Sequence, residues 1–240
     1  MKNGLIKLEN YQITPLCKSD ILSENDFQII NSKSGKVFIS KRPFELQKSK
    51  FWITIYCKDN LINKVELKNN SNNRNYSDLS DQLIDKLQKD NIDFLFRCLG
   101  APSKKTISGV EYSYDWGKVF SYFDNKSADI GIVIQYNDKY LQIGNKSHIF
   151  NHAIRKVIKF KSRVVVLIYD DLIITNNVIA FDNEGNQLWK INDLLDCKKP
   201  MGNVDIGKDN DKVLSVISAA GLEYKINVEI AKLVEKLYLK

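Results

Sequence analysis

Apolar and polar residues alternate over most of this chain, and that pattern is typical of strands that bury one face. The longest apolar run lies at 164–169, and two further strands are predicted at 178–182 and 187–191. Similar alternation earlier in the chain predicts two hairpins, over 27–41 and 51–68. Clusters of Asp, Asn and Gly separate these runs. Because such residues favour tight turns, the pattern predicts antiparallel strands.

Only one segment has the spacing of a long helix, and it covers residues 77–99. Ser77 can cap its first turn, while Gly100 and Pro102 can end it. Apolar side chains recur every three or four residues, so they should form one stripe that faces the core. The expected stripe consists of Leu79, Leu83, Ile84, Leu87, Ile92, Leu95, Phe96 and Leu99.

These elements predict an α+β fold in two domains, with mainly antiparallel sheet and one long helix. The first domain, residues 1–140, is expected to pack helix 77–99 on its sheet. The second, residues 141–240, is expected to be a small, nearly all-β meander with blade-like hairpins. The polar segment 137–151 is the candidate boundary, and the tail at 230–237 fits either a strand or a short helix.

Composition places the chain among ordinary globular proteins, with 43% hydrophobic and 27% charged residues. The N-terminus lacks the apolar core of a secretory signal, and no apolar run approaches the roughly 20 residues that span a bilayer. The four cysteines are widely spaced and form no CxxC motif. We therefore expect a cytoplasmic protein with reduced cysteines and no membrane partner.

The net charge of +7 is spread evenly along the sequence. Nucleic-acid-binding proteins usually concentrate basic residues on one face, so we do not expect a nucleic-acid partner. The densest basic group is Arg155, Lys156, Lys159, Lys161 and Arg163. On one strand, Lys159, Lys161 and Arg163 would share a face. That face is either solvated or a surface for an acidic partner; weak nucleic-acid binding through 155–163 is a third possibility.

Motifs for catalysis are missing from the sequence, which has no GxSxG, no glycine-rich phosphate loop and no Cys–His pair at a recognised spacing. We therefore predict no catalytic residues, no cofactor and no metal site. His148 and His152 would point the same way on a helix, but spacing implies no third ligand. Asp170 and Asp171 follow an apolar strand. The alternative function is thus an enzyme, or a small-ligand or metal-binding protein, with a site near these four residues.

A segment within residues 112–136 carries a family resemblance. It contains Trp116-Gly117-Lys118-Val119, then Ser121-Tyr122-Phe123-Asp124, then Ala128-Asp129-Ile130. This string resembles a segment of small uncharacterised bacterial proteins, some of which are similar to immunity proteins of polymorphic toxin systems. The resemblance implies a non-catalytic protein that binds and neutralises a cognate toxin domain.

The positive charge favours a toxin with an acidic surface, because complementary fields select partners. The residues expected to bind that partner are Arg155, Lys156, Lys159, Lys161, Arg163, Asp170 and Asp171. Exposed Tyr and Trp side chains would also suit a protein-binding patch, although the sequence does not identify which of them are exposed.

Residues 178–191 carry a second resemblance, through Asp182, Gly185 and Trp189. Their spacing resembles the strand–turn–strand of a quinoprotein-type propeller blade. A partial echo follows 45 residues later at Asn227–Val234, without the turn glycine. Because about 100 residues supply at most two blades and propellers need about four, a small meander is the expected structure.

Overall fold

The computed structural model describes residues 1, 3–32, 35–69, 80–127, 129–169, 175–195 and 201–239. The chain divides into two compact units, Met1–Asp138 and Lys139–Lys240. Among these described residues, strands make up 55% and helices 12%, and the strands form five separate antiparallel sheets. The α+β prediction is therefore wrong. The long helix exists, but it covers only part of one sheet, and the second unit holds several sheets where one meander was expected.

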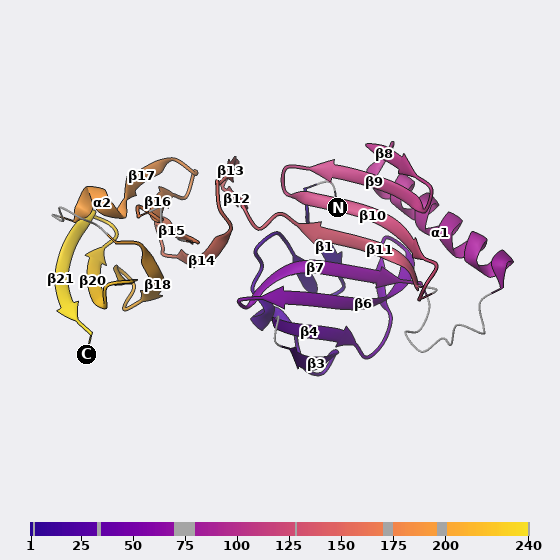
Figure 1. The fold of residues 1–240 in the computed structure, drawn as a ribbon, viewed down its shortest axis with the longest axis horizontal. Coiled ribbons are helices and arrows are strands. Elements are labelled where there is room, and N and C mark those ends of the chain that lie inside the picture. The colour runs from indigo at the N-terminus through magenta and orange to yellow at the C-terminus, as the bar shows by residue number, and fades with distance from the viewer. Residues whose placement is uncertain are drawn as a thin grey trace. The chain divides into compact units, whose positions relative to one another are not determined.

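The first unit is built on a nine-stranded antiparallel sheet (Figure 1). Its strands follow the order β3-β4-β6-β7-β11-β10-β9-β8, and β5 pairs with β6 outside this path. Their bounds are β3 (Phe27–Ser32), β4 (Gly35–Ser40), β5 (Phe44–Leu46), β6 (Ser49–Lys58), β7 (Leu61–Lys68), β8 (Lys104–Thr106), β9 (Gly109–Tyr114), β10 (Gly117–Asp124) and β11 (Asp129–Tyr136). The two predicted hairpins are confirmed as β3–β4 and β6–β7.

Helix α1 (Asp81–Leu99) packs on one face of this sheet, where the Phe94 and Phe51 ring centroids lie 4.8 Å apart. Ser80 caps the helix by accepting a hydrogen bond from the backbone N–H of Leu83, and Gly100 ends it with φ of 86°. The predicted cap, Ser77, lies outside the described residues. Leu79 of the predicted stripe also lies outside the described residues. Among the described positions the stripe was wrong at Phe96, which is 58% exposed, whereas Phe94 is the buried aromatic residue.

A short N-terminal hairpin covers another part of the same face, with strands β1 (Ile6–Leu8) and β2 (Tyr11–Ile13). The hydroxyl of Tyr136 on β11 donates to the Gly4 carbonyl at 3.0 Å. A short 3-10 helix, η1 (Ser19–Ile21), follows the hairpin. The hairpin and α1 together cover what we call the inner face of the sheet.

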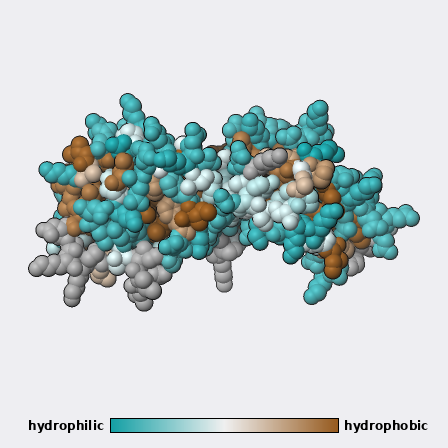
Figure 2. Space-filling model, turned by 90° about the horizontal axis from the view of Figure 1, so that it is seen from above, coloured by the Kyte–Doolittle hydropathy of each residue, from teal (hydrophilic) through white to brown (hydrophobic). Residues whose placement is uncertain are grey.

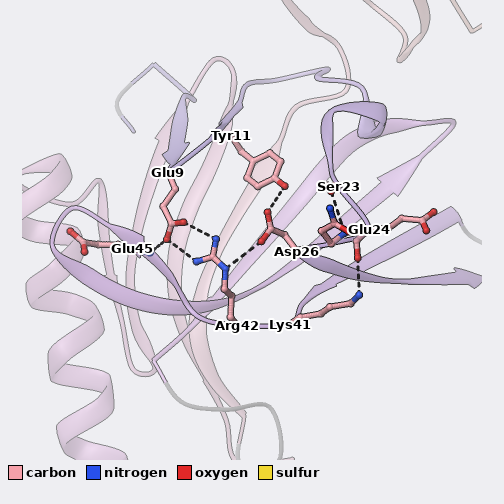
Figure 3. A network of polar contacts seen from close by, with 9 residues as sticks. Glu9, Tyr11, Ser23, Glu24, Asp26, Lys41, Arg42 and Glu45 are labelled. Atoms are coloured by element: carbon pink, nitrogen blue, oxygen red, sulfur yellow. Dashed lines mark hydrogen bonds and ion pairs between the residues drawn. The ribbon is translucent and has the colours of Figure 1, made fainter.

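A polar network attaches this hairpin to the sheet (Figure 3). The guanidinium of Arg42 donates to both carboxylate oxygens of Glu9, at 3.1 and 2.8 Å, and to Asp26 at 3.3 Å. The Tyr11 hydroxyl donates to the other oxygen of Asp26 at 2.7 Å. The hydrogen bonds from Arg42 lower the pKa of Glu9, so its carboxylate is ionised at neutral pH.

The second unit contains a hairpin and two four-stranded antiparallel sheets. The hairpin is β12 (Tyr140–Ile143) with β13 (Lys146–Ile149). One sheet holds β14 (Ile154–Lys159), β15 (Arg163–Ile168), β16 (Val178–Asp182) and β17 (Gln187–Lys190), followed by the short helix α2 (Ile191–Leu194). The other holds β18 (Asn203–Lys208), β19 (Val213–Ser218), β20 (Leu222–Asn227) and β21 (Lys232–Tyr238).

Apolar side chains from both four-stranded sheets share one core, which contains Val165, Leu167 and Trp189 from the first and Val216 and Ile226 from the second. Asn177 links the sheets from a fully buried position. Its amide donates to the carbonyls of Ile168 and Asn203, and its oxygen accepts from the backbone N–H of Asn203. Since these groups are shielded from water, their hydrogen bonds cannot be replaced by solvent.

The two halves of the sequence echo occupy the same place in successive sheets, since each spans the turn between the third and fourth strands. Asp182 accepts hydrogen bonds from the backbone N–H groups of Glu184 and Asn186. Asn227 likewise accepts from the N–H of Glu229 at 3.1 Å. The echo therefore marks two turns at the same place, in each of which an Asp or Asn side chain accepts a hydrogen bond from the backbone N–H two positions further on.

Candidate functional site

The strongest candidate site is the face of the nine-stranded sheet opposite α1, which we call the open face. Successive side chains on a strand point to opposite faces. On β6, Ile53 and Ile55 are fully buried on the inner face. The intervening side chains are half-buried, and the same holds on β7 and β10. The open face is formed by Trp52, Thr54, Tyr56, Lys64, Glu66, Lys68, Lys118, Phe120, Tyr122, Val133 and Gln135.

Strand register arranges these side chains in rows across the sheet. In one row, Tyr56 lies opposite Lys64, Lys64 opposite Gln135, and Gln135 opposite Lys118. In the next row, Thr54, Glu66, Val133 and Phe120 follow one another in the same way. Each row draws on four strands from distant parts of the chain. The open face is thus a continuous surface of mixed aromatic, basic and acidic side chains.

Tyr122 lies across the sheet over Gly131, which is directly opposite it on β11. A Cβ atom at Gly131 would come within 3.1 Å of the Tyr122 ring and 2.9 Å of the Leu67 carbonyl oxygen. The missing side chain therefore makes room for the ring. The Tyr122 hydroxyl donates to Asp129 at 2.9 Å, and Asp129 forms an ion pair with Lys68 at 2.7 Å. These contacts hold the aromatic ring in one orientation.

Tyr56 is fixed in a similar way on β6, which is three strands away from β10 in the sheet. Its hydroxyl donates to Glu66 at 3.0 Å, and Lys64 donates to the other oxygen of Glu66 at 2.8 Å. The Lys64 ammonium also lies 3.7 Å from the centroid of the Tyr56 ring, which is a cation–π contact. Aromatic, acidic and basic groups therefore satisfy one another on this face.

Burial raises the pKa of Tyr56, and the nearby Glu66 carboxylate raises it further. Burial and the hydrogen bond to Asp129 likewise raise the pKa of Tyr122. Both phenols therefore remain protonated at neutral pH and act as hydrogen-bond donors. Such groups are suited to binding and not to taking up a proton.

The predicted basic group lies elsewhere, around the β14–β15 turn of the second unit. The prediction that Lys159, Lys161 and Arg163 share one strand face is wrong, because the turn separates them: the N–H of Phe160 donates to the carbonyl of Arg163 at 2.8 Å. Lys159 ends β14, Lys161 is in the turn and Arg163 begins β15.

The two other basic residues of this group, Arg155 and Lys156, already make contacts within the second unit. Lys156 forms an ion pair with Asp205 on β18 at 2.9 Å, which joins the two four-stranded sheets. The Arg155 guanidinium lies 5.8 Å from the centroid of the Tyr169 ring. Asp170 and Asp171, which were also predicted to bind a partner, lie outside the described residues.

His148 and His152 do not lie on a helix. His148 is on β13, and His152 lies in the connection from β13 to β14. The described residues hold no group of three or more His, Cys, Asp or Glu side chains that could bind a metal ion. His148 packs on Phe181, with ring centroids 4.6 Å apart, and its buried Nε2 atom has no hydrogen-bond partner.

His148 also lines an open pocket of about 640 Å³ in the second unit. The described lining combines apolar and polar side chains, including Phe150, Asn176, Phe181 and Lys190. His152 is not among them. The structure therefore brings only one of the two predicted histidines to a pocket.

Sequence reasoning missed the open-face residues, although one feature pointed to them. In the predicted strands 51–57 and 61–68, Tyr56, Glu66 and Lys68 occupy the positions that alternate with the apolar core residues. Such positions face away from the core. These residues lie near Tyr122 and Asp129 because β7 pairs with β11. Sequence spacing does not predict that pairing.

Comparison with known proteins identifies a family for part of the chain. Residues 132–238 match the family described as Domain of unknown function (DUF7957), a segment that covers less than half of the chain and includes most of the second unit. No curated protein matches the sequence. Among the described residues, no helix has the length and hydrophobicity needed to cross a membrane.

Similarity to solved structures is weak. Hsv2 from Kluyvelomyces marxianus is 11% identical, with 90% of this chain and 80% of that chain covered and a TM-score of 0.32. Apo AztD from Citrobacter koseri is 11% identical, with 97% and 77% covered and a TM-score of 0.27. TM-scores this low support no conclusion about shared fold or function.

Proposed function

We propose that this chain is a cytoplasmic, non-catalytic protein-binding module that contacts its partner through the open face. The observation that carries the proposal is the pair of fixed tyrosines, Tyr56 and Tyr122, on a continuous half-buried surface. Tyrosine is enriched among residues that dominate binding energy. Because ion pairs already hold both rings in place, little conformational entropy is lost when a partner docks.

More narrowly, we propose an immunity-type protein that binds and neutralises a cognate bacterial toxin domain. The segment that resembles immunity proteins, residues 112–136, forms β9, β10 and β11, and it supplies Tyr122 and Asp129 to the open face. The chain's net charge of +7 favours an acidic partner surface. The support for this narrower proposal is the position of the resembling segment on the open face and the net charge of the chain. The growth assay described below tests whether the partner is a toxin.

A photo-crosslinking experiment tests the binding surface. A photoreactive phenylalanine analogue replaces Phe120 on the open face or, as the control, Phe96 on the exposed side of α1. We expect one defined crosslinked partner from cells of the source organism at Phe120, and loss of that product when Tyr122→Arg is added. Equal crosslinking at Phe96, or no effect of Tyr122→Arg, would count against the open face.

A growth assay tests the narrower proposal. The coding sequence beside this gene is expressed alone and then together with the chain. We expect toxicity that the chain relieves, and we expect Tyr122→Arg but not Phe96→Arg to abolish that relief. If the crosslinked partner has no toxicity, the immunity function is wrong even though protein binding stands.

The pocket at His148 supports a second candidate, a small-ligand or metal-binding site. Its size lies in the range of small-molecule sites, which is about 300–1,000 Å³. The test is metal analysis of the purified protein and a thermal-shift screen, each with His148→Ala and with His152→Ala for comparison. Ligand stabilisation that only His148→Ala removes would favour this candidate over protein binding alone.

A further inference from the structure

Strand β21 ends the last four-stranded sheet, and its burial differs from that of other end strands. It has seven residues, and most of its side chains are exposed. Among the described strands that end a four- or nine-stranded sheet, it is the longest: β3, β14 and β18 have six residues, β17 four and β8 three. An end strand presents unpaired N–H and C=O groups to its surroundings, so its length sets how much backbone can pair with another chain.

Large apolar side chains gather at this strand and beside it. The exposed ones are Ile230 (66%), Val234 (61%), Leu237 (37%), Tyr238 (78%) and Leu239 (45%). Figure 2 shows hydrophobic side chains at the surface of this unit, at the end where Figure 1 places β20 and β21. Burying this surface against a partner would be favourable.

The other described end strands carry fewer exposed apolar side chains: β3 has Ile30 (42%) and β17 has Leu188 (43%), one on each. On β14, the exposed side chains are Arg155 and Lys159, and Lys156 is paired with Asp205. Charged side chains and contacts of that kind discourage the addition of a foreign strand. Among the described end strands, the longest unpaired edge and the largest number of exposed apolar side chains therefore occur together at β21.

The charges on β21 favour an acidic occupant. The strand carries two lysines, Lys232 and Lys236, and one glutamate, Glu235, which lies opposite Lys225 on β20. Lys232 and Lys236 have no carboxylate within ion-pair distance among the described residues. A second copy of the chain would bring two more such lysines to the interface, whereas an acidic segment would compensate them.

We propose that β21 accepts an extended acidic segment of another polypeptide, which pairs with it as a fifth strand of the β18–β21 sheet. Main-chain hydrogen bonds provide the affinity. Apolar side chains of the segment cover Val234 and Leu237. Its carboxylates pair with Lys232 on one face of the sheet and with Lys236 on the other, because the register shift in β21 puts these lysines opposite Asn227 and Tyr224. This surface is separate from the open face, so the inference does not depend on the function proposed above.

The test uses two synthetic eight-residue peptides, one repeating valine-glutamate-glutamate and one repeating valine-lysine-lysine, so that each carries charged side chains on both faces of a strand. Each peptide is added to the full chain. Backbone amide hydrogen exchange is followed by NMR. We expect the glutamate peptide to bind at least tenfold more tightly than the lysine peptide and to slow exchange at β21. The double variant Lys232→Glu and Lys236→Glu should reverse this preference, whereas Lys159→Glu on β14 should leave it unchanged.

Three outcomes would overturn the proposal: no slowing at β21 with saturating glutamate peptide, a preference that the double variant does not alter, or protection of β21 that grows with protein concentration without peptide. The last would assign the edge to a second copy. Tyr122→Arg separates this test from that of the open face, because it should leave peptide binding unchanged. Circular dichroism of each variant verifies that the sheets remain folded.

Discussion

The two units bury their strands in different ways, and the surface that remains differs accordingly. The first unit has one wide sheet, whose inner face is covered by α1 and the β1–β2 hairpin. Its other face keeps Tyr56 and Tyr122 half-buried and held by ion-paired side chains. The second unit packs two narrow sheets on a shared core, so its exposed feature is the edge strand β21. A wide single sheet therefore offers a face for binding, while paired narrow sheets offer a strand edge.

The first unit depends on its helix for covering the inner face, and Phe94→Ala tests that dependence. Phe94 is 2% exposed and packs against Phe51. We expect a loss of about 3–5 kcal/mol in the free energy of unfolding, because the substitution removes a large buried ring and leaves a cavity. Urea denaturation is followed by the fluorescence of Trp52 and Trp116 in a Trp189→Phe background.

The matched control is Phe96→Ala, two positions along the same helix. Because Phe96 is 58% exposed, its removal should change the free energy of unfolding by less than about 0.5 kcal/mol. Equal losses from the two substitutions would show that α1 does not pack as described.

The second unit depends on contact between two sheets, and Asn177→Ala tests this. The substitution leaves the carbonyls of Ile168 and Asn203 and the N–H of Asn203 without their buried partner. We expect a loss of about 2–4 kcal/mol, since each unsatisfied buried group costs about 1–3 kcal/mol and relaxation recovers part of it. Trp189 fluorescence, in a chain that lacks Trp52 and Trp116, reports on this unit alone.

Asn183→Ala is the control for this prediction. The Asn183 amide makes a single exposed hydrogen bond, to the Lys161 carbonyl. Its loss should barely move the urea midpoint. If Asn177→Ala were equally mild, the buried hydrogen bonds of Asn177 would contribute little to holding the two sheets together.

Local alternation was enough to predict the hairpins but not the fold class. The β3–β4 and β6–β7 hairpins follow from period-two patterns and turn residues that lie close together in sequence. The helix was correctly located, yet its apolar stripe did not distinguish Phe94 from Phe96, since that depends on where β6 lies. The sequence left the last segment open between strand and helix, and pairing with β20 decides for a strand.

The candidate site could be predicted only in part, for a similar reason. The positions of Tyr56 and Glu66 indicate that they face away from the core, because they alternate with buried residues. However, the ion pair between Lys68 and Asp129 joins residues 61 positions apart. Such pairing depends on long-range register, which local patterns do not specify. The prediction that Lys159, Lys161 and Arg163 share a strand face was wrong because a turn divides them.

Gly131→Ala tests how closely the open face is fitted together. The new Cβ would crowd the Tyr122 ring and the Leu67 carbonyl, so the ring must move away from Asp129. We expect a loss of about 1–3 kcal/mol in the free energy of unfolding, as is usual for overpacking. The pKa of Tyr122 should also fall toward its ordinary value as the ring gains solvent and loses its carboxylate partner, which an ultraviolet pH titration measures.

Gly207→Ala in the second unit is the control for this prediction. There a new Cβ would meet nothing nearer than 3.9 Å. The substitution should leave both stability and tyrosine titration almost unchanged. An unaltered Tyr122 titration in Gly131→Ala would mean that the glycine does not position the ring.

The smallest expected effect concerns the Arg42 network that attaches the N-terminal hairpin to the first unit. Arg42 lowers the folded-state pKa of Glu9. The stabilisation from Glu9 is therefore fully present above its unfolded pKa, and it is lost as the pH falls through the folded value. Glu9→Gln should lower the urea midpoint slightly at pH 7, by less than Phe94→Ala, Asn177→Ala or Gly131→Ala, because solvent screens this partly exposed pair. The difference from the parent should disappear at low pH, whereas Glu24→Gln, whose backbone carbonyl and not its carboxylate contacts Lys41, should show no such pH dependence. A difference that persisted in acid would attribute the effect to the shape of the side chain and not to its charge.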